Sequence, residues 1–261
     1  MMELVDSHAH LDAEQFADDC GAVIERAAAA GVVKILTMGD SIESSARSVA
    51  LADRHEAVYA AVGIHPEEAR PMTAEDDDSL AAWTEMEKVV AIGEIGLDYY
   101  WEKDEEKRAL QRRIFVRQLD LARQLQLPVC IHDREAHGDM IRLLKTEGRG
   151  LRGVLHCYSG SWEMAQELLP YGWYFGIDGP LTYKNASCPT SCAACLPRGS
   201  SSRRIRRICR PFPTAASAMS RPMSVTLRRR RRNFAEKILK SLPRERGRTR
   251  ECFMEFERKF F

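Results

Sequence analysis

One recurring pattern in the first 157 residues constrains the fold more than any other feature. Short strand-like runs each carry a His or Glu at or near their C-terminal end, at residues 5–10, 63–66, 92–96, 130–133 and 154–157. Side chains alternate faces along a strand, so His8 and His10 would point the same way. One strand can therefore offer two imidazoles to a single cation, and the pattern predicts a metal site.

Strand-like and helix-like stretches alternate through residues 1–186. Amphipathic stretches such as 14–30, 105–126 and 161–170 separate apolar runs at 3–6, 32–38, 57–64, 89–95, 127–132, 152–157 and 173–178. This βα repetition, with ionisable residues gathered at strand C-termini, predicts an α/β protein of the TIM-barrel type. A doubly wound open sheet is the alternative, but no glycine-rich phosphate loop follows the first run.

Charge divides the chain near residue 186. Residues 187–261 hold 20 of the 39 Lys and Arg but only five of the 38 Asp and Glu, and no Asp follows Ala186. We therefore expect a barrel domain over 1–186 and an aberrant basic tail over 187–261, irregular except for a short helix near 234–242. A tail of this composition predicts an incomplete barrel that lacks a proper eighth strand.

Membrane association is not expected from the apolar patterning. No apolar run approaches the roughly 20 residues that a spanning helix needs, and no basic segment followed by an apolar one opens the chain. The eight cysteines do not indicate disulfides, because Cys20, Cys130 and Cys157 are scattered and the others lie in the basic tail. We expect a cytoplasmic monomer.

Five motifs in order resemble the TatD-type deoxyribonucleases, which are metal-dependent hydrolases on a TIM barrel. The motifs are Ser-His-Ala-His-Leu-Asp at 7–12, Ala-Val-Gly-Ile-His-Pro-Glu at 61–67, Gly-Glu-Ile-Gly-Leu-Asp-Tyr at 93–99, Ile-His-Asp-Arg at 131–134 and Leu-His-Cys-Tyr-Ser-Gly at 155–160. The resemblance covers residues 1–186. It implies that one or two divalent cations are held by a late Asp together with His8, His10, Glu94, His132 and His156.

Phosphodiester hydrolysis explains why such ligands would be needed. The reaction requires charge neutralisation at the phosphoryl oxygens and a hydroxide near neutral pH, and two cations about 3.5–4 Å apart supply both. Glu94 is expected to be catalytic as the bridging carboxylate, with His8 and His10 on one metal and His132 and His156 on the other. Imidazole and carboxylate donors suit Zn²⁺ or Mn²⁺, and the resemblance also admits Mg²⁺.

Three further residues are expected to contact substrate, which the resemblance predicts to be DNA. His65 lies near the site in the family without being a standard ligand, so packing beside Pro66 is its alternative role. Arg134 and Tyr158 lie within two of the motifs, each two residues after a ligand histidine, although loop charges are usually solvated and loop aromatics usually buried. The alternative enzymatic hypothesis is an amidohydrolase-like activity on a small ester or amide.

The resemblance ends after Ala186. The family pattern calls there for an eighth strand ending in Glu-Thr-Asp-Ser-Pro and for an Arg-Gly-Lys-Arg-Asn-Glu-Pro segment, and neither is present. In a shifted reading frame, codons for residues 202–209, 210–226 and 243–251 permit these two segments and a third family-like ending. We therefore hypothesise a frameshift near residues 186–188, which would remove the late Asp. The non-enzymatic alternative is an inactive fragment whose basic tail binds nucleic acid.

Overall fold

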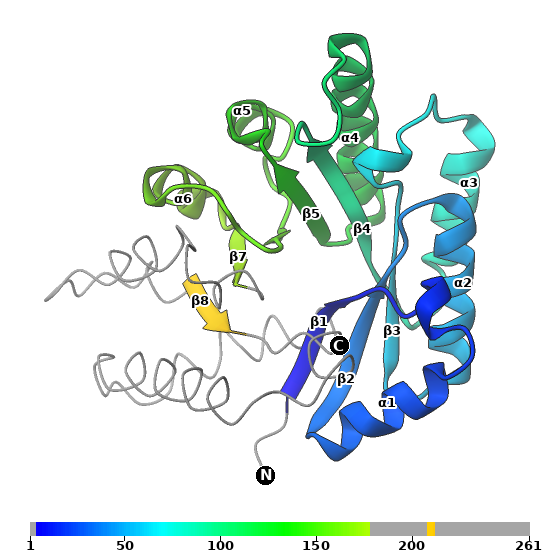
Figure 1. The fold of residues 1–261 in the computed structure, drawn as a ribbon. Coiled ribbons are helices and arrows are strands. Elements are labelled where there is room, and N and C mark those ends of the chain that lie inside the picture. Colours follow the sequence, from blue (N-terminus) through cyan, green and yellow to red (C-terminus); the bar gives the residue numbers. More distant parts are fainter. Residues whose placement is uncertain (1–3, 178–207, 212–261) are drawn as a thin grey trace, which may run out of the picture.

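A single curled parallel sheet organises the protein. The structure, a computed structural model, describes residues 4–177 and 208–211 (Figure 1). The strands pair in sequence order, β1 to β8, and each is parallel to the next. Their bounds are Leu4–Ala9, Val32–Met38, Val58–Val62, Val89–Asp98, Val129–Arg134, Gly153–Leu155, Tyr174–Ile177 and Ile208–Pro211. This sequential order is that of a βα barrel and excludes the doubly wound alternative, whose strand order reverses.

The barrel is incomplete in the part of the chain that the structure describes. β8, which the sequence analysis did not expect, is a four-residue strand in the basic tail that pairs Ile208 with Phe175 of β7. Within the described residues no ladder joins β8 to β1, so the sheet stays open (Figure 1). The helix expected near 234–242 lies outside the described residues.

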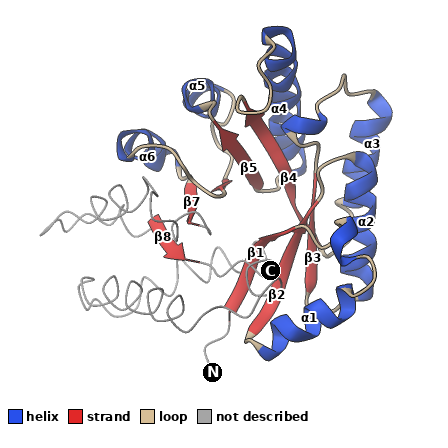
Figure 2. Cartoon of the chain, in the orientation of Figure 1, coloured by secondary structure: helices blue, strands red, loops and turns tan. Residues whose placement is uncertain are grey.

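Helices connect the strands and cover the convex face of the sheet (Figure 2). They are α1 to α6, at Cys20–Ala29, Ile42–Arg54, Ala74–Trp83, Glu105–Leu125, His137–Thr146 and Trp162–Leu168, with 3₁₀ turns at Glu14–Phe16, Pro66–Glu68 and Leu169–Tyr171. Side chains of Ser41, Thr73, Asp104 and Ser161 accept backbone N–H bonds at four helix starts, which explains where those helices begin. None of the helices in the described ranges combines the length and apolarity needed to cross a bilayer.

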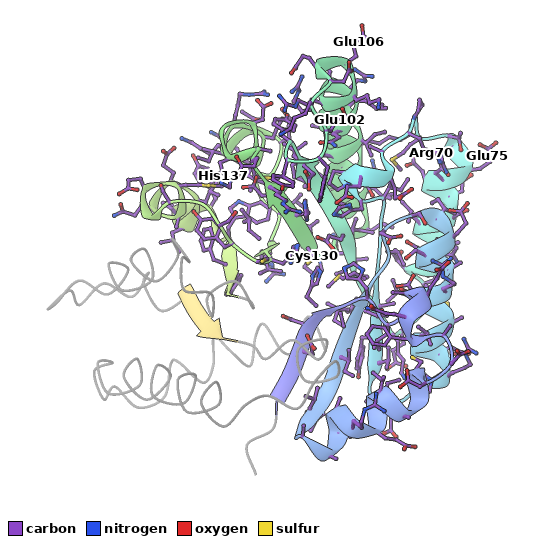
Figure 3. All side chains as sticks on the ribbon, in the orientation of Figure 1. Arg70, Glu75, Glu102, Glu106, Cys130 and His137 are labelled. Atoms are coloured by element: carbon purple, nitrogen blue, oxygen red, sulfur yellow. The ribbon has the colours of Figure 1, made fainter. Side chains whose placement is uncertain are left out.

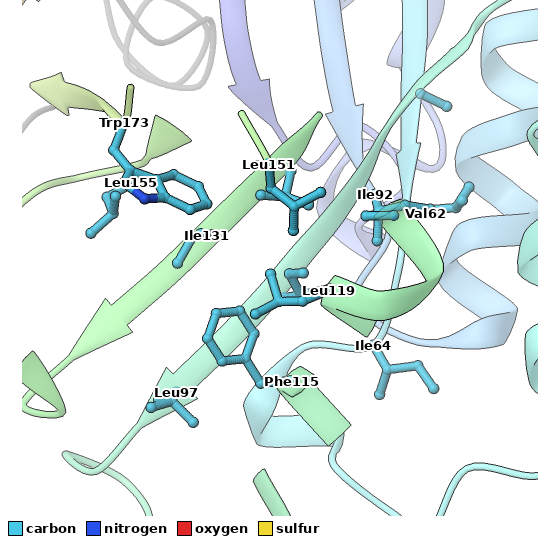
Figure 4. Close-up of a cluster of buried hydrophobic side chains, with 14 of the residues drawn as sticks. Val62, Ile64, Ile92, Leu97, Phe115, Leu119, Ile131, Leu151, Leu155 and Trp173 are labelled. Atoms are coloured by element: carbon cyan, nitrogen blue, oxygen red, sulfur yellow. The ribbon is translucent and has the colours of Figure 1, made fainter. Parts of the chain in front are cut away.

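Two apolar layers lie on opposite faces of the sheet. The outer layer, between sheet and helices, is built from large side chains, among them Phe115, Leu119, Ile131, Leu155 and Trp173 (Figure 4). The inner layer, on the concave face, is smaller and consists of Leu36, Met38, Ala61, Ala91 and Cys130. Strand alternation explains the division: in β5, Val129 and Ile131 join the outer layer, whereas Cys130 joins the inner one.

Candidate metal centre

The predicted site residues meet at the C-terminal mouth of the sheet. His8 lies in β1, His10 just after it, and Glu94 and His132 lie in β4 and β5. His65 follows β3 and His156 follows β6. Because all the strands are parallel, their C-terminal ends lie at one edge, and alternation places His132 on the same concave face as Cys130. The structure thus brings together residues separated by up to 148 positions.

A break in the strand register directs Glu94 inward. Ile92 and Ile95 both pack in the outer layer, and the β4–β5 register shifts between them. The two residues in between form a bulge, which lets Glu94 point into the mouth while its neighbours remain buried. Its backbone N–H donates to the carbonyl of Gly39 at 2.8 Å, and the residue is 2% exposed.

Imidazoles surround both oxygens of the Glu94 carboxylate. Oε2 lies 3.1 Å from His8 Nε2 and 3.3 Å from His10 Nε2. Oε1 lies 2.5 Å from His156 Nε2 and 3.0 Å from His132 Nδ1. A carboxylate with nitrogen donors at each oxygen has the arrangement needed to bridge two cations.

Two groups of three donors have ligand atoms within 4.8 Å of one another, one formed by His8, Glu94 and His156 and the other by His65, Glu94 and His132. The grouping by distance therefore places His156 beside His8, and their rings stack with centroids 3.8 Å apart. The predicted pairing of His156 with His132 on one metal corresponds instead to the carboxylate oxygen that each ring faces, because both lie nearest to Glu94 Oε1. His156 lies between the two halves of the site.

The electrostatics of the site suit a cation. Burial and the neighbouring His156 lower the pKa of His8 to about 4, and burial lowers the pKa of His65 to about 4. Both rings are therefore neutral near pH 7, which is the form that binds metal. Burial by itself would raise the pKa of Glu94, but His156 and His8 outweigh it and hold that pKa well below its ordinary value. Burial also acts to lower the pKa of His10 and His132, but hydrogen bonds to Glu94, and for His132 also to Asp98, outweigh it and raise both pKa values. An ionised carboxylate beside the neutral rings of His8 and His65 fits a divalent ion.

Asp98 orients His132. His132 Nε2 lies 2.9 Å from Asp98 Oδ2, and Asp98 is fully buried. An Nε2–H that donates to this carboxylate leaves Nδ1 unprotonated and facing Glu94. Histidines that bind metals commonly donate their other ring N–H to a carboxylate in this way. The motif contained Asp98, but only the β4–β5 pairing, with Asp98 beside Arg134, brings it to the His132 ring. Local sequence carries no signal for that contact.

Gly96 allows β4 and β5 to approach at the site. Its φ of +147° is a conformation that side chains with a Cβ rarely adopt. A Cβ at this position would lie 2.0 Å from the carbonyl oxygen of His132, with which Gly96 is paired in the ladder. Glycine is therefore required next to a residue of the site.

A cavity of about 320 Å³ opens above the Glu94 carboxylate. Its lining combines imidazoles and carboxylates, from His10, Asp40, His65, Glu67, Glu68, Glu94, His132 and His156. Asp40 and Glu68 were not anticipated, because each lies in a loop or short turn with no motif to mark it, and Glu67 ends the 61–67 motif but was given no role. They make the open side of the cavity more negative than the sequence suggested.

The three expected substrate residues lie in different settings. His65 lines the cavity, with its Nε2 3.7 Å from Glu94 Oε1. The exposed Arg134 places its guanidinium 4.1 Å from the centroid of the Tyr100 ring. Tyr158 donates its hydroxyl to the carbonyl of Ser161 at 2.6 Å and packs on Phe175, so its ring supports the loop after β6.

The fold and this cluster define a metal-dependent hydrolase built on a TIM barrel, and comparison with known proteins gives the family. The sequence model of the TatD related DNase family matches residues 5–200. The chain is 41% identical over 187 residues to the uncharacterized metal-dependent hydrolase YabD of Bacillus subtilis, spanning 71% of this chain and 72% of that protein. It is 36% identical over 177 residues to the 3'-5' ssDNA/RNA exonuclease TatD of Citrobacter koseri, spanning 67% of each.

A solved structure agrees with this assignment. The crystal structure of YJJV, a TatD homologue from Escherichia coli, superposes with a TM-score of 0.68 at 31% identity, covering 80% of this chain and 78% of that one. The chain therefore belongs to the TatD related DNase family. The expected family, the barrel fold and the class of metal-dependent hydrolase are confirmed.

Proposed function

We propose that this protein is a metal-dependent phosphodiesterase that shortens DNA from an end, as an exonuclease. The observation that carries the proposal is the Glu94 carboxylate, which is buried and has imidazoles at both oxygens. Relatives that share this chain's family carry the name 3'-5' ssDNA/RNA exonuclease, which supports a nucleic-acid substrate.

The distances around Glu94 support one assignment of the metal ligands. His8 and His10 at Oε2, and His132 and His156 at Oε1, would hold one or two divalent cations with Glu94 between them. Imidazole and carboxylate donors favour Zn²⁺ or Mn²⁺, and Mg²⁺ remains a candidate. Such cations, when bound, neutralise charge on a phosphodiester and make a water molecule acidic.

His65 is assigned to the substrate rather than to the metal. Its Nδ1 accepts a hydrogen bond from the backbone N–H of Glu67 at 3.2 Å, so the proton of the neutral ring resides on Nε2. An Nε2–H cannot ligate a cation, but it can donate to a phosphate oxygen in the cavity. We therefore assign His65 to hold the scissile phosphate against Glu94 and its imidazoles.

Metal removal tests the function directly. Protein stripped with a chelator should not degrade an end-labelled single-stranded oligonucleotide, and adding Mg²⁺, Mn²⁺ or Zn²⁺ should restore degradation. Glu94→Gln should abolish the restored activity, whereas Glu106→Gln, at an exposed position in the first turn of α4, should not (Figure 3). Salt-sensitive binding without hydrolysis under any of these metals would instead favour an inactive fragment with a nucleic-acid-binding tail.

One observation favours a second candidate function, hydrolysis of a small ester or amide. Asp40, Glu67 and Glu68 add negative charge around a cavity of only about 320 Å³, and this charge repels a polyanion. The same preparation should be offered a neutral aryl ester, an aryl amide and the oligonucleotide. Metal-dependent turnover of the neutral substrates alone would replace the nuclease proposal with this one.

A further inference from the structure

Two exposed aromatic side chains stand beside the metal centre. Tyr100 and Trp101 lie two and three residues after the end of β4 and are 43% and 61% exposed. The only other large apolar side chains exposed in the described ranges are Val33 and Met86. The Tyr100 and Trp101 rings meet edge to face at 81°, with centroids 4.8 Å apart, so the two together form one continuous exposed surface.

The loop that carries these rings is anchored to the metal centre. Asp98 Oδ1 accepts the backbone N–H groups of both Tyr100 and Trp101, each at 2.9 Å. The other oxygen of the same carboxylate contacts His132 Nε2. One buried side chain therefore fixes the aromatic loop and a proposed metal ligand together, so the rings keep a constant position relative to the cavity.

Arg134 adds positive charge to this surface. It lies two residues after His132 on the same face of β5, hence about 6.6 Å further along the strand toward the mouth. Its guanidinium lies 4.1 Å from the Tyr100 ring centroid and 5.4 Å from that of Trp101. Among the described residues no carboxylate forms an ion pair with Arg134, so its N–H donors are available to a ligand.

We propose that Tyr100, Trp101 and Arg134, here called the aromatic platform, bind the nucleotide next to the scissile phosphodiester of a single strand. Trp101 stacks on its base, and Arg134, held against Tyr100, donates to its phosphate. Unpaired strands expose their base faces, and aromatic side chains beside cationic groups are the surfaces that bind them. A duplex stacks its bases internally and cannot use the platform.

Charge around the mouth supports this placement. Beyond the imidazoles that would hold the scissile phosphate, the cavity wall carries Asp40, Glu67 and Glu68, which disfavour a second phosphate, whereas the platform carries Arg134 with Lys103 Nζ 5.5 Å from the Tyr100 ring. A polyanion would therefore enter along the platform. The inference rests on the proposed nuclease function and assigns it a single-stranded substrate and a contact for the base.

The test measures binding, so it does not need an active enzyme. Fluorescence anisotropy gives the Kd of the full-length, metal-free chain for a labelled deoxythymidine oligonucleotide and for an abasic oligonucleotide of equal length. Both carry the same phosphates, so attraction to the basic tail affects them equally. Trp101→Ala should weaken binding of the base-bearing strand about tenfold or more and leave the abasic strand unchanged. Trp101→Phe, which keeps an aromatic ring, should weaken binding of the base-bearing strand less than Trp101→Ala does.

Met86→Ala is the matched control, because Met86 is an exposed apolar residue that precedes β4 and so lies at the opposite end of the sheet. It should bind both strands as the unaltered chain does. Equal Kd values for Trp101→Ala and the unaltered chain, with the variant folded by circular dichroism, would overturn the platform and leave the nuclease proposal standing. Failure of the unaltered chain to bind either strand would overturn the nuclease proposal as well.

Discussion

The two faces of the sheet are built for different purposes. The convex face carries Ile, Leu, Val and Phe side chains buried under the helices, whereas the concave face carries small apolar residues below and imidazoles and carboxylates at the mouth. In β5 the two sets alternate residue by residue. Because adjacent residues face opposite ways, stability and chemistry occupy the same strands without competing for positions.

Because of this separation, substitutions on one face should change stability and substitutions on the other should change metal binding or catalysis. Substitutions in the outer layer should lower the free energy of unfolding while leaving the ligand geometry of the folded state intact. Substitutions at the mouth should change metal binding or catalysis, with little effect on unfolding. The predictions below test each face in turn.

Phe115→Ala should cause the largest change. Phe115 is completely buried in the outer layer between α4 and the sheet, so truncation should cost about 3–5 kcal/mol of unfolding free energy. Urea unfolding measures it, with Arg113→Ala at an exposed position of α4 as control. The folded variant should bind Mn²⁺ with unchanged affinity. A loss below about 1 kcal/mol, or weakened metal binding, would contradict the separation of the faces.

The frameshift hypothesis predicts that restoring the reading frame raises the catalytic rate of the site on the concave face. The coding DNA should specify Glu-Thr-Asp-Ser-Pro across codons 202–207 in the alternative frame, and the restored chain should regain the late Asp. Removing one oriented polar group commonly costs roughly 10²–10³ in rate, so restored and present chains should differ by about that factor in oligonucleotide hydrolysis. Unrelated residues or a stop in that frame would end the frameshift hypothesis, whereas equal rates would show that the late Asp is not needed for catalysis.

Asp98→Asn should weaken metal binding by roughly 10- to 100-fold, because the uncharged amide orients and polarises His132 less well than the carboxylate does. Calorimetric titration with Mn²⁺ or Zn²⁺ measures this affinity. Asp139→Asn is the control, since Asp139 accepts the Tyr99 hydroxyl at 2.7 Å and pairs with Arg112 on the helix side. Unchanged affinity in Asp98→Asn would remove Asp98 from the site.

Asp76→Ala should have the smallest effect, about 1 kcal/mol of unfolding free energy, with Asp78→Ala on the same helix as control. Asp76 closes a capping box with Thr73 and pairs with Arg70, and that pairing lowers the pKa of Asp76 to about 2. A lowered folded-state pKa stabilises above the unfolded value, near 3.9, and the contribution disappears as the pH falls through about 2. Thermal unfolding scans should therefore show the difference between the variant and the unaltered chain shrinking below pH 4. A constant difference would exclude this ion pair as its source.

The two parts of the sequence differ in how much of the structure they could predict. Within 1–186 every strand-terminal motif agrees with the strand that carries it, and the βα repetition led to the correct fold. In the tail, patterning predicted no strand, yet Ile208–Pro211 forms β8 beside β7. This four-residue strand has only Cys209 and Arg210 between Ile208 and Pro211, and so no alternation marks it and only the pairing partner reveals it.

The sequence by itself determined the repetition of strands and helices, the family, and the histidines at the strand ends, because these depend on local periodicity and on short motifs. Tertiary structure alone decided how they combine. The bulge that directs Glu94 inward, the contact of Asp98 with His132, the acids around the cavity and the position of Tyr100 and Trp101 beside Arg134 all depend on strand register and loop course. Those are set by packing between residues far apart in the chain, which no local pattern records.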